Sequence, residues 1–148
     1  MIKRLIPLTL FAICLGLVFL SRWAWHMDNF LRHPVTYFGA ASVLLGAALA
    51  VLGLYQLRKA RTTVAAFHEP EHLVTGGVYR FTRNPIYLGL ALMLAGADIL
   101  LGTHCLLVPM LVFLIAVDRW VVRREEKTIA RKFGKEYEDY RSKTPRWV

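Results

Sequence analysis

The stretch LVTGGVYRFTRNPIYLG, residues 73–89, decides how the rest of the sequence is interpreted. It lies between hydrophobic segments and opens on a glycine pair that permits a tight turn. Tyr79, Arg80 and Arg83 follow, and an Asn-Pro pair then leads straight into an apolar run that contains a second tyrosine, Tyr87. Asn is favoured at the N-cap of a helix and Pro at its first position, so Asn84 and Pro85 predict a helix start. The sequence therefore places polar chemistry directly against the beginning of an apolar helix.

Hydrophobic residues make up 56% of the 148 residues, and they concentrate in three runs, residues 5–20, 35–57 and 86–117. A membrane-spanning helix needs about 20 residues. The third run is too long for one span and is expected to form a hairpin that turns near residues 98–104. We therefore predict an all-α integral membrane protein with four transmembrane helices, of which the last two form a tight hairpin. The first run resembles a signal peptide, but no cleavage site is evident and we expect an uncleaved span.

The distribution of charge supports this count of four spans. The net charge is +9, and the basic residues flank the apolar runs, which favours membrane topology over nucleic-acid binding. Four spans place all but two of the 19 basic residues on one side. The positive-inside rule then assigns both termini to the cytoplasm, and we expect a bacterial inner membrane. The single membrane domain would comprise two N-terminal spans (1–57), a cytoplasmic loop (58–85), the hairpin (86–118) and a cytoplasmic tail (119–148).

The tail is expected to continue the fourth helix as an amphipathic helix that bends near Gly134. Helical spacing of three and four unites Glu126, Ile129, Phe133, Tyr137 and Tyr140 on one face. Lys127, Arg131 and Lys135 lie on another face. Such a helix either anchors the chain to anionic lipid or forms a lid over a site.

Polar and aromatic residues around the Asn-Pro helix start have both structural and functional interpretations. A helix N-terminus attracts anions, so a carboxylate or phosphate near residues 85–87 would be stabilised there, with Arg83 alongside. Tyr79 and Tyr87 either belong to an interfacial aromatic belt or place their rings against a base or a cation. The structural alternatives are a helix cap for Asn84 and ordinary juxtamembrane charge for Arg83.

Two adjacent carboxylates, Glu125 and Glu126, follow the last apolar run in the sequence RREEK. Helical spacing groups Arg119, Arg123 and Glu126 on one face and Asp118, Val122 and Glu125 on another. The two carboxylates either form a solvated helix face, or Glu125 offers an acid that could bind an ammonium group near the end of the hairpin.

Cysteine and histidine positions favour neither a disulfide framework nor a metal site. Cys14 and Cys105 lie inside apolar runs and are expected to be small buried residues. His68 and His72 are four residues apart in HEPEH, but Pro70 between them would break a helix. We therefore predict no metal site.

Two motifs in the right order resemble a known family. LVTGGVYRFTRNPIYLG, followed by an apolar hairpin and then RREEKTIARKFGKEYEDYRSKTPRW, resembles the isoprenylcysteine carboxyl methyltransferase and phospholipid N-methyltransferase group of integral membrane enzymes. The resemblance covers residues 71–147, and it implies S-adenosylmethionine bound at the cytoplasmic end of the hairpin. The residues that it places around this cofactor are Glu71, His72, Leu73, Val74, Tyr79, Arg83, Asn84, Pro85, Ile86, Tyr87, Glu125 and Glu126. Glu125 would hold the cofactor from the tail and Arg119 or Arg123 would face the substrate, so these three residues are the catalytic candidates.

The chain departs from this family at one position, because well-known members have Arg-His-Pro where this chain has Arg83-Asn84-Pro85. Asn does not titrate near neutral pH, which puts in doubt any mechanism that needs a base there. The implied partners are membrane lipids and a lipophilic or lipidated methyl acceptor, which could be a carboxylate, an amine or a thiol. Two alternatives are a membrane reductase of the sterol type, for which the tail leaves little room, and a non-enzymatic lipid-binding scaffold.

Overall fold

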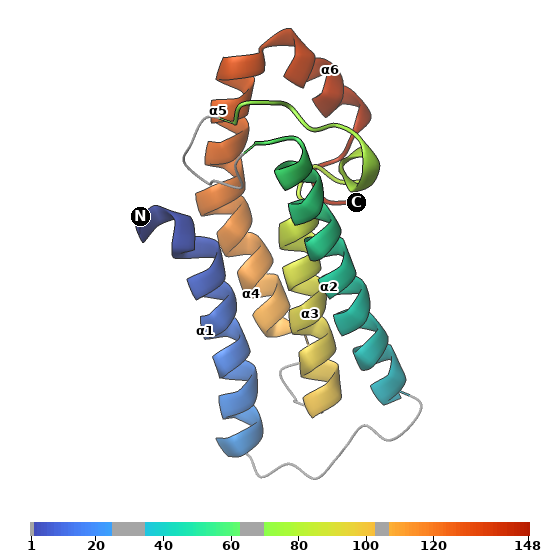
Figure 1. Cartoon of the computed structure of the whole chain (residues 1–148). Coiled ribbons are helices and arrows are strands. Elements are labelled where there is room, and N and C mark those ends of the chain that lie inside the picture. Colours follow the sequence, from blue (N-terminus) through green and yellow to red (C-terminus); the bar gives the residue numbers. More distant parts are fainter. Residues whose placement is uncertain (1, 25–34, 63–69, 103–106) are drawn as a thin grey trace.

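The computed structural model describes residues 2–24, 35–62, 70–102 and 107–148, and every regular element within these ranges is helical (Figure 1). The elements are α1 (Ile2–Ala24), α2 (Val35–Lys59), the short 3-10 helix η1 (Gly77–Arg80), α3 (Pro85–Leu101), α4 (Val108–Val117), the π-helical turn η2 (Asp118–Val122), α5 (Arg123–Phe133) and α6 (Lys135–Lys143). The prediction of an all-α chain is confirmed for these ranges.

Helices α1 to α4 run side by side as an elongated bundle, and α5 continues α4 beyond one end of it (Figure 1). Of these, α1 and α2 are long and apolar enough to cross a membrane, whereas α3 is a shorter apolar helix. The 17 residues of α3 extend about 26 Å, which is slightly less than the hydrocarbon thickness of a bilayer. Two of the predicted spans thus have the required length, and the four-span arrangement stays a prediction.

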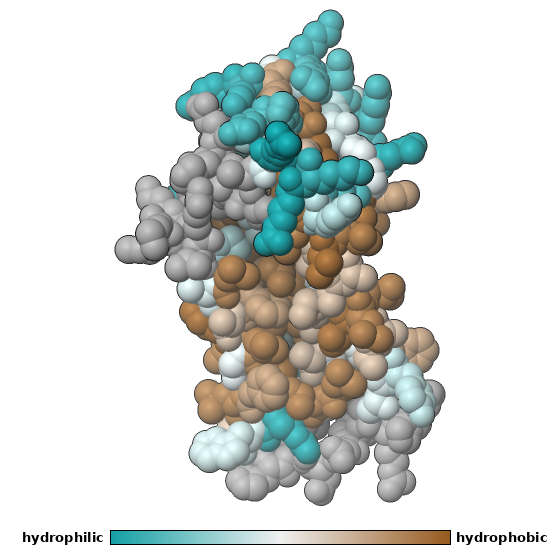
Figure 2. All heavy atoms as spheres, in the orientation of Figure 1, coloured by the Kyte–Doolittle hydropathy of each residue, from teal (hydrophilic) through white to brown (hydrophobic). Residues whose placement is uncertain are grey.

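The outer surface of the bundle is apolar along its middle. Figure 2 shows apolar side chains over this part of one face and hydrophilic ones gathered at the end that carries α5 and α6. Phe38 on α2 and Ile13 on α1 are 69% and 60% exposed, and many other large apolar side chains of both helices are exposed as well. A surface of this extent needs apolar surroundings, as a membrane provides.

Helices α2 and α3 are antiparallel and touch through glycines. Gly39, Gly46 and Gly53 recur every seven residues on α2, and Gly89 and Gly96 do so on α3. Because seven residues make about two helical turns, each set faces one side of its helix. A Cβ added at Gly46 would lie 2.5 Å from the carbonyl oxygen of Gly89, so the two backbones are in direct contact. This packing through small residues is typical of helices in membranes.

A hydrogen bond and an apolar core complete the bundle. The hydroxyl of Ser42 on α2 donates to the carbonyl oxygen of Leu92 on α3 at 2.8 Å. On the other side of α3, a core joins α1, α3 and α4, and its fully buried members include Cys14, Leu94 and Phe113. The prediction that Cys14 is a buried apolar residue is confirmed, and Cys105 lies outside the described residues.

The α3–α4 hairpin is closed by Asp98, which is 1% exposed. Its carboxylate accepts a hydrogen bond from the backbone N–H of Leu107 at 2.6 Å, just before α4 begins. The helix α3 ends at Gly102, whose φ of 61° is the left-handed conformation that glycine adopts without strain. The turn therefore begins at Gly102, four residues later than the predicted start at residue 98, and residues 103–106 lie outside the described part.

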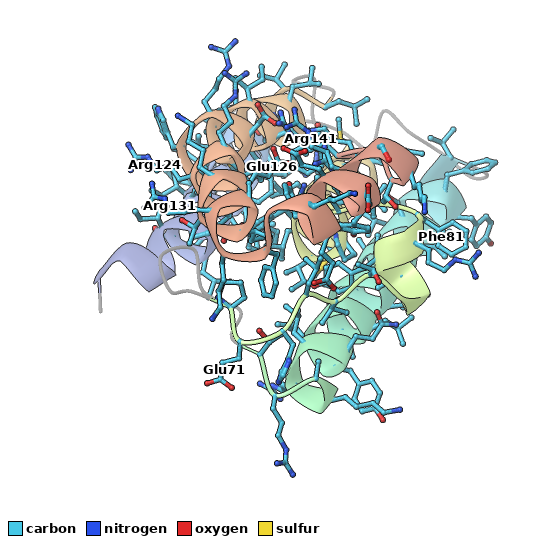
Figure 3. All side chains as sticks on the ribbon, turned by 90° about the horizontal axis from the view of Figure 1, so that it is seen from above. Glu71, Phe81, Arg124, Glu126, Arg131 and Arg141 are labelled. Atoms are coloured by element: carbon cyan, nitrogen blue, oxygen red, sulfur yellow. The ribbon has the colours of Figure 1, made fainter. Side chains whose placement is uncertain are left out.

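The tail leaves the bundle as α4, η2 and α5 in one continuous helical run and reverses at Gly134, where the predicted bend is confirmed. Figure 3 looks down on this end, where Arg124 and Arg131 point outward and Glu126 lies toward the centre. The predicted amphipathic character is also confirmed, because Tyr137 is buried whereas Lys127 is exposed.

We expect that Gly46→Ala lowers the free energy of unfolding by about 1–3 kcal/mol, because the new methyl group would push α2 away from the α3 backbone. Thermal unfolding in detergent would measure the change. Gly16→Ala on α1 is the matched control, since nothing lies within 4 Å of a Cβ added there. Equal melting temperatures for the two variants would contradict the proposed backbone contact.

Candidate active site

The loop before α3 and the end of the tail are hydrogen-bonded to each other at the polar end of the bundle. The backbone N–H of Arg83 donates to the carbonyl oxygen of Pro145 at 3.0 Å. The hydroxyl of Tyr140 on α6 donates to the carbonyl oxygen of Tyr79 at 2.7 Å. Segments about 60 residues apart in sequence thus form one polar layer.

Asn84 occupies the predicted helix start, but its side chain does not cap the helix. It lies at the N-cap position of α3 and Pro85 follows at the first helical position, as predicted. No capping hydrogen bond comes from the Asn84 side chain, whose Nδ2 instead donates to the carbonyl oxygen of Arg146 at 3.0 Å. The hydroxyl of Thr82 donates to the same oxygen at 3.0 Å. Asn84 therefore fastens the C-terminal segment, residues 144–147, to the start of α3.

The two motifs meet directly at Tyr87 and Glu125. The hydroxyl of Tyr87, on the first turn of α3, donates to Oε1 of Glu125 on α5 at 2.9 Å. The residues are 38 positions apart, and the α3–α4 hairpin returns the chain so that they come together. Tyr79, which is 7% exposed, belongs to the same cluster through its electrostatic contact with Glu125.

Glu125 is a carboxyl group that titrates near neutral pH. Burial raises its pKa to about 7, the hydrogen bond from Tyr87 acts in the opposite direction, and the neighbouring Glu126 adds to the rise. In the part of the chain that the structure describes, Glu125 forms no ion pair. A partly buried carboxylate of this kind can bind a cation.

Glu126 has the opposite environment, because two guanidinium groups neutralise it. Nη1 of Arg83 lies 3.1 Å from its Oε1. The Nε and Nη2 of Arg146 donate to Oε1 and Oε2 at 3.1 Å and 2.5 Å in a bidentate pair. The Nη1 of Arg83 also donates to the hydroxyl of Tyr137 at 3.0 Å.

The π-helical turn η2 determines which tail residues share a face. An uninterrupted α-helix would place Asp118 and Glu126 about 80° apart, and the wider turn brings them closer together. Arg146 bridges the two, since its Nη1 donates to Asp118 at 3.1 Å. Arg123 reaches Asp118 five residues earlier at 3.2 Å, the spacing of a π-helix. The faces predicted for residues 118–126 are therefore wrong, because that prediction assumed α-helical spacing throughout.

The predicted cofactor residues fall into two groups. The structure brings Tyr79, Arg83, Asn84, Pro85, Tyr87, Glu125 and Glu126 to the polar end of the hairpin. The remaining five are Glu71, His72, Leu73, Val74 and Ile86.

Among these five, Glu71 and His72 are exposed, and Glu71 points away from the helices (Figure 3). Leu73 and Val74 are half-buried, and Ile86 faces Gly53 of α2. Their roles stay predictions.

The arginines predicted to face a substrate lie on the outside of the tail. Arg119 is exposed, and Arg123, whose side chain is 52% exposed, pairs with Asp118. Sequence reasoning missed Arg146 and Thr82, although both lie inside the two quoted motifs. The available signal was TPRW. Arg146 follows Pro145, where the tail helix must already have ended, so a position on a helix face does not account for this arginine.

Histidine and cysteine do not build a metal site in the described residues, where no group of three potential ligands comes together. His68 of the HEPEH sequence lies outside these residues.

Comparison with known proteins places most of the chain in one family. Residues 34–136 match the family described as phospholipid methyltransferase. The chain is 32% identical over 114 residues to a probable protein-S-isoprenylcysteine O-methyltransferase of Oryza sativa subsp. indica, which covers 74% of this chain and 58% of that protein. It is 35% identical to the protein-S-isoprenylcysteine O-methyltransferase of Schizosaccharomyces pombe over 86 residues, 55% of this chain and 35% of that protein.

A third relative has a different acceptor in its name. The methanethiol S-methyltransferase of Crocosphaera subtropica is 25% identical over 127 residues, 82% of this chain and 49% of that protein. The chain spans about half the length of the curated relatives it matches. No solved structure matches it. Because the matched region covers most of the chain and contains both α3 and the Glu125–Glu126 pair, this protein belongs to the phospholipid methyltransferase family.

Proposed function

We propose that the protein is an S-adenosylmethionine-dependent methyltransferase that acts on a lipophilic or membrane-associated acceptor. The contact between Tyr87 and Glu125 carries the proposal, because it joins the two motifs at the polar end of an apolar helical hairpin. The similar proteins are named for methyl transfer to oxygen and to sulfur, so the proposed reaction class is common to relatives with different acceptors.

The residues at this end fit the charges of S-adenosylmethionine. Glu125, without an ion-pair partner in the described residues, suits the α-ammonium group. The Nε of Arg83 is buried and donates to no partner within the described part of the chain. The carboxylate of the cofactor would accept this missing hydrogen bond. The N-terminus of α3 adds a partial positive charge beside it. The rings of Tyr79 and Tyr87 suit the adenine or the sulfonium.

S-adenosylmethionine supplies an activated methyl group when it is bound. The residues of the chain would orient it and exclude water. Ionised Glu125 would hold the ammonium group, and the Tyr87 hydroxyl fixes the direction of that carboxylate. Asn84 cannot supply a base, since its amide does not titrate and already donates to the Arg146 carbonyl oxygen. A carboxylate or thiolate acceptor, which needs no strong base, suits this site best.

The location of the site determines how the reactants would reach it. We place the polar end with α5, α6 and both termini in the cytoplasm, because that end carries most of the basic residues. The cofactor would enter from the cytoplasm. The acceptor would enter from the bilayer between helices, whose outer surface is apolar. Transfer of a labelled methyl group from S-adenosylmethionine to prenylcysteine, phospholipid and thiol acceptors in detergent is the experiment that tests this function.

We expect that Glu125→Gln weakens binding of S-adenosylmethionine about 10- to 100-fold, the value of a charge-assisted hydrogen bond. Tyr87→Phe keeps the ring and should weaken binding about 2- to 10-fold through the lost hydroxyl. Calorimetry on detergent-purified protein would measure both. Glu136→Gln is the matched control, because Glu136 is exposed on α6. If Glu125→Gln binds as tightly as the wild type, Glu125 does not hold the cofactor.

The affinity should also depend on pH. Glu125 is protonated below a pKa of about 7 and then cannot pair with an ammonium group, so affinity should rise about tenfold per unit from pH 5.5 toward 7 and level off above it. Measurements should stop near pH 7.5, since an α-amino group loses its proton from about 7.7 upward. The Glu125→Gln variant should give a flat profile. A wild-type profile that is equally flat would refute the assignment.

A further inference from the structure

Two adjacent carboxylates on α5 have opposite surroundings. Glu126 is neutralised by Arg83 and Arg146, whereas the hydrogen-bond partner of Glu125 is the neutral Tyr87. The sequence gives no reason for this difference, because both glutamates are flanked by the same basic residues. The difference arises from Arg83 and from Arg146, and Arg146 comes from the far end of the chain.

Arg146 contacts the site through both its backbone and its side chain. Its carbonyl oxygen accepts hydrogen bonds from Thr82 and Asn84, which immediately precede α3. Its guanidinium forms the bidentate pair with Glu126 and reaches Asp118 at the π-helical turn. One residue therefore ties the start of α3, which carries Tyr87, to the start of α5, which carries Glu125.

The carboxylates of Asp118 and Glu126 are neutralised, whereas Glu125 takes no part in this network. Arg83, Arg123 and Arg146 face Asp118 and Glu126, so three cations meet two anions. Hydrogen bonding to Glu126 is the main reason why the pKa of Arg146 is raised above its ordinary value. The side chain of Arg146 is 28% exposed, which leaves it less screened than a free surface arginine.

We propose that Arg146 is a positioning residue that selects Glu125, and not Glu126, as the carboxylate presented to the ammonium group of the cofactor. The proposal rests on the proposed function. Arg146 touches neither reactant in this arrangement. It acts by pairing its guanidinium with the Glu126 carboxylate and by fixing the position of α3 relative to α5.

The electrostatic effect of Arg146 on Glu125 passes through Glu126. The groups that face Glu125 are Tyr87 from α3, Tyr79 from η1 and Glu126 on its own helix. Of these only Glu126 carries a charge at neutral pH, and its negative charge opposes ionisation of Glu125. Loss of the Arg146 guanidinium would leave that charge less compensated. Glu125 would then ionise at a higher pH.

The test compares the pH profile of S-adenosylmethionine binding for the wild type and Arg146→Gln. We expect the midpoint to move upward by roughly half to one pH unit, so that the affinity of Arg146→Gln is still rising at pH 7.5, where that of the wild type levels off. The double variant Arg146→Gln/Glu126→Gln should bring the midpoint back down, because the opposing charge is gone. Arg141→Gln, an exposed arginine on α6, is the matched control and should leave the midpoint unchanged.

A purely structural role for Arg146 would give a different result. Affinity would then fall equally at every pH with no movement of the midpoint, and that outcome would overturn the proposal. Thermal unfolding identifies variants that fail to fold, and Arg146→Lys, which keeps the charge but not the bidentate pair, should then shift the midpoint less than Arg146→Gln.

A second readout separates this proposal from the proposed function. Infrared titration of the protonated carboxyl band, assigned by its loss in Glu125→Gln, follows Glu125 without any cofactor. If the wild type does not bind S-adenosylmethionine, the proposed function fails. An infrared midpoint that is the same with and without Arg146 overturns the positioning role, whatever the cofactor result.

Discussion

The hydrogen bonds from Thr82 and Asn84 to the carbonyl oxygen of Arg146 hold the polar end of this protein together. They attach the last residues of the chain to the start of α3, so the loop, α5 and α6 become one layer. Both donors are buried, at 2% and 9% exposed, where an unpaired polar group would be costly. The pairing of Tyr87 with Glu125 and the neutralisation of Glu126 depend on this attachment, because they need α3 and α5 at a fixed separation.

The rest of the bundle supplies a rigid support for this layer. The glycine contact between α2 and α3 brings two backbones together, which leaves little freedom for α3 to slide or rotate. Asp98 closes the opposite end of the α3–α4 hairpin. Packing against α2 thus fixes α3 along its length, and hydrogen bonds to the C-terminal segment fix its start. The outer surface stays apolar, which separates the part that suits a lipid environment from the part that holds the charges.

The difference between Glu125 and Glu126 illustrates how burial and pairing divide roles between identical side chains. Glu126 meets two guanidinium groups. Glu125 meets a neutral hydroxyl in a partly buried place, and burial raises its pKa to about 7. A pair that looks like one acidic patch in the sequence is therefore one carboxylate held in ion pairs and one carboxyl group that has no ion pair within the described residues.

The sequence by itself determined the helical class, the first two apolar helices, the helix start at Asn84-Pro85, the bend at Gly134 and the inward and outward faces of the far tail. These are local properties, set by hydrophobic periodicity, by proline and by glycine. Only the tertiary structure decided that Asn84 binds the Arg146 carbonyl oxygen in place of capping its helix, and that a π-helical turn moves Glu126 onto the face of Asp118. Both depend on contacts between residues far apart in sequence, whose energies no local pattern contains.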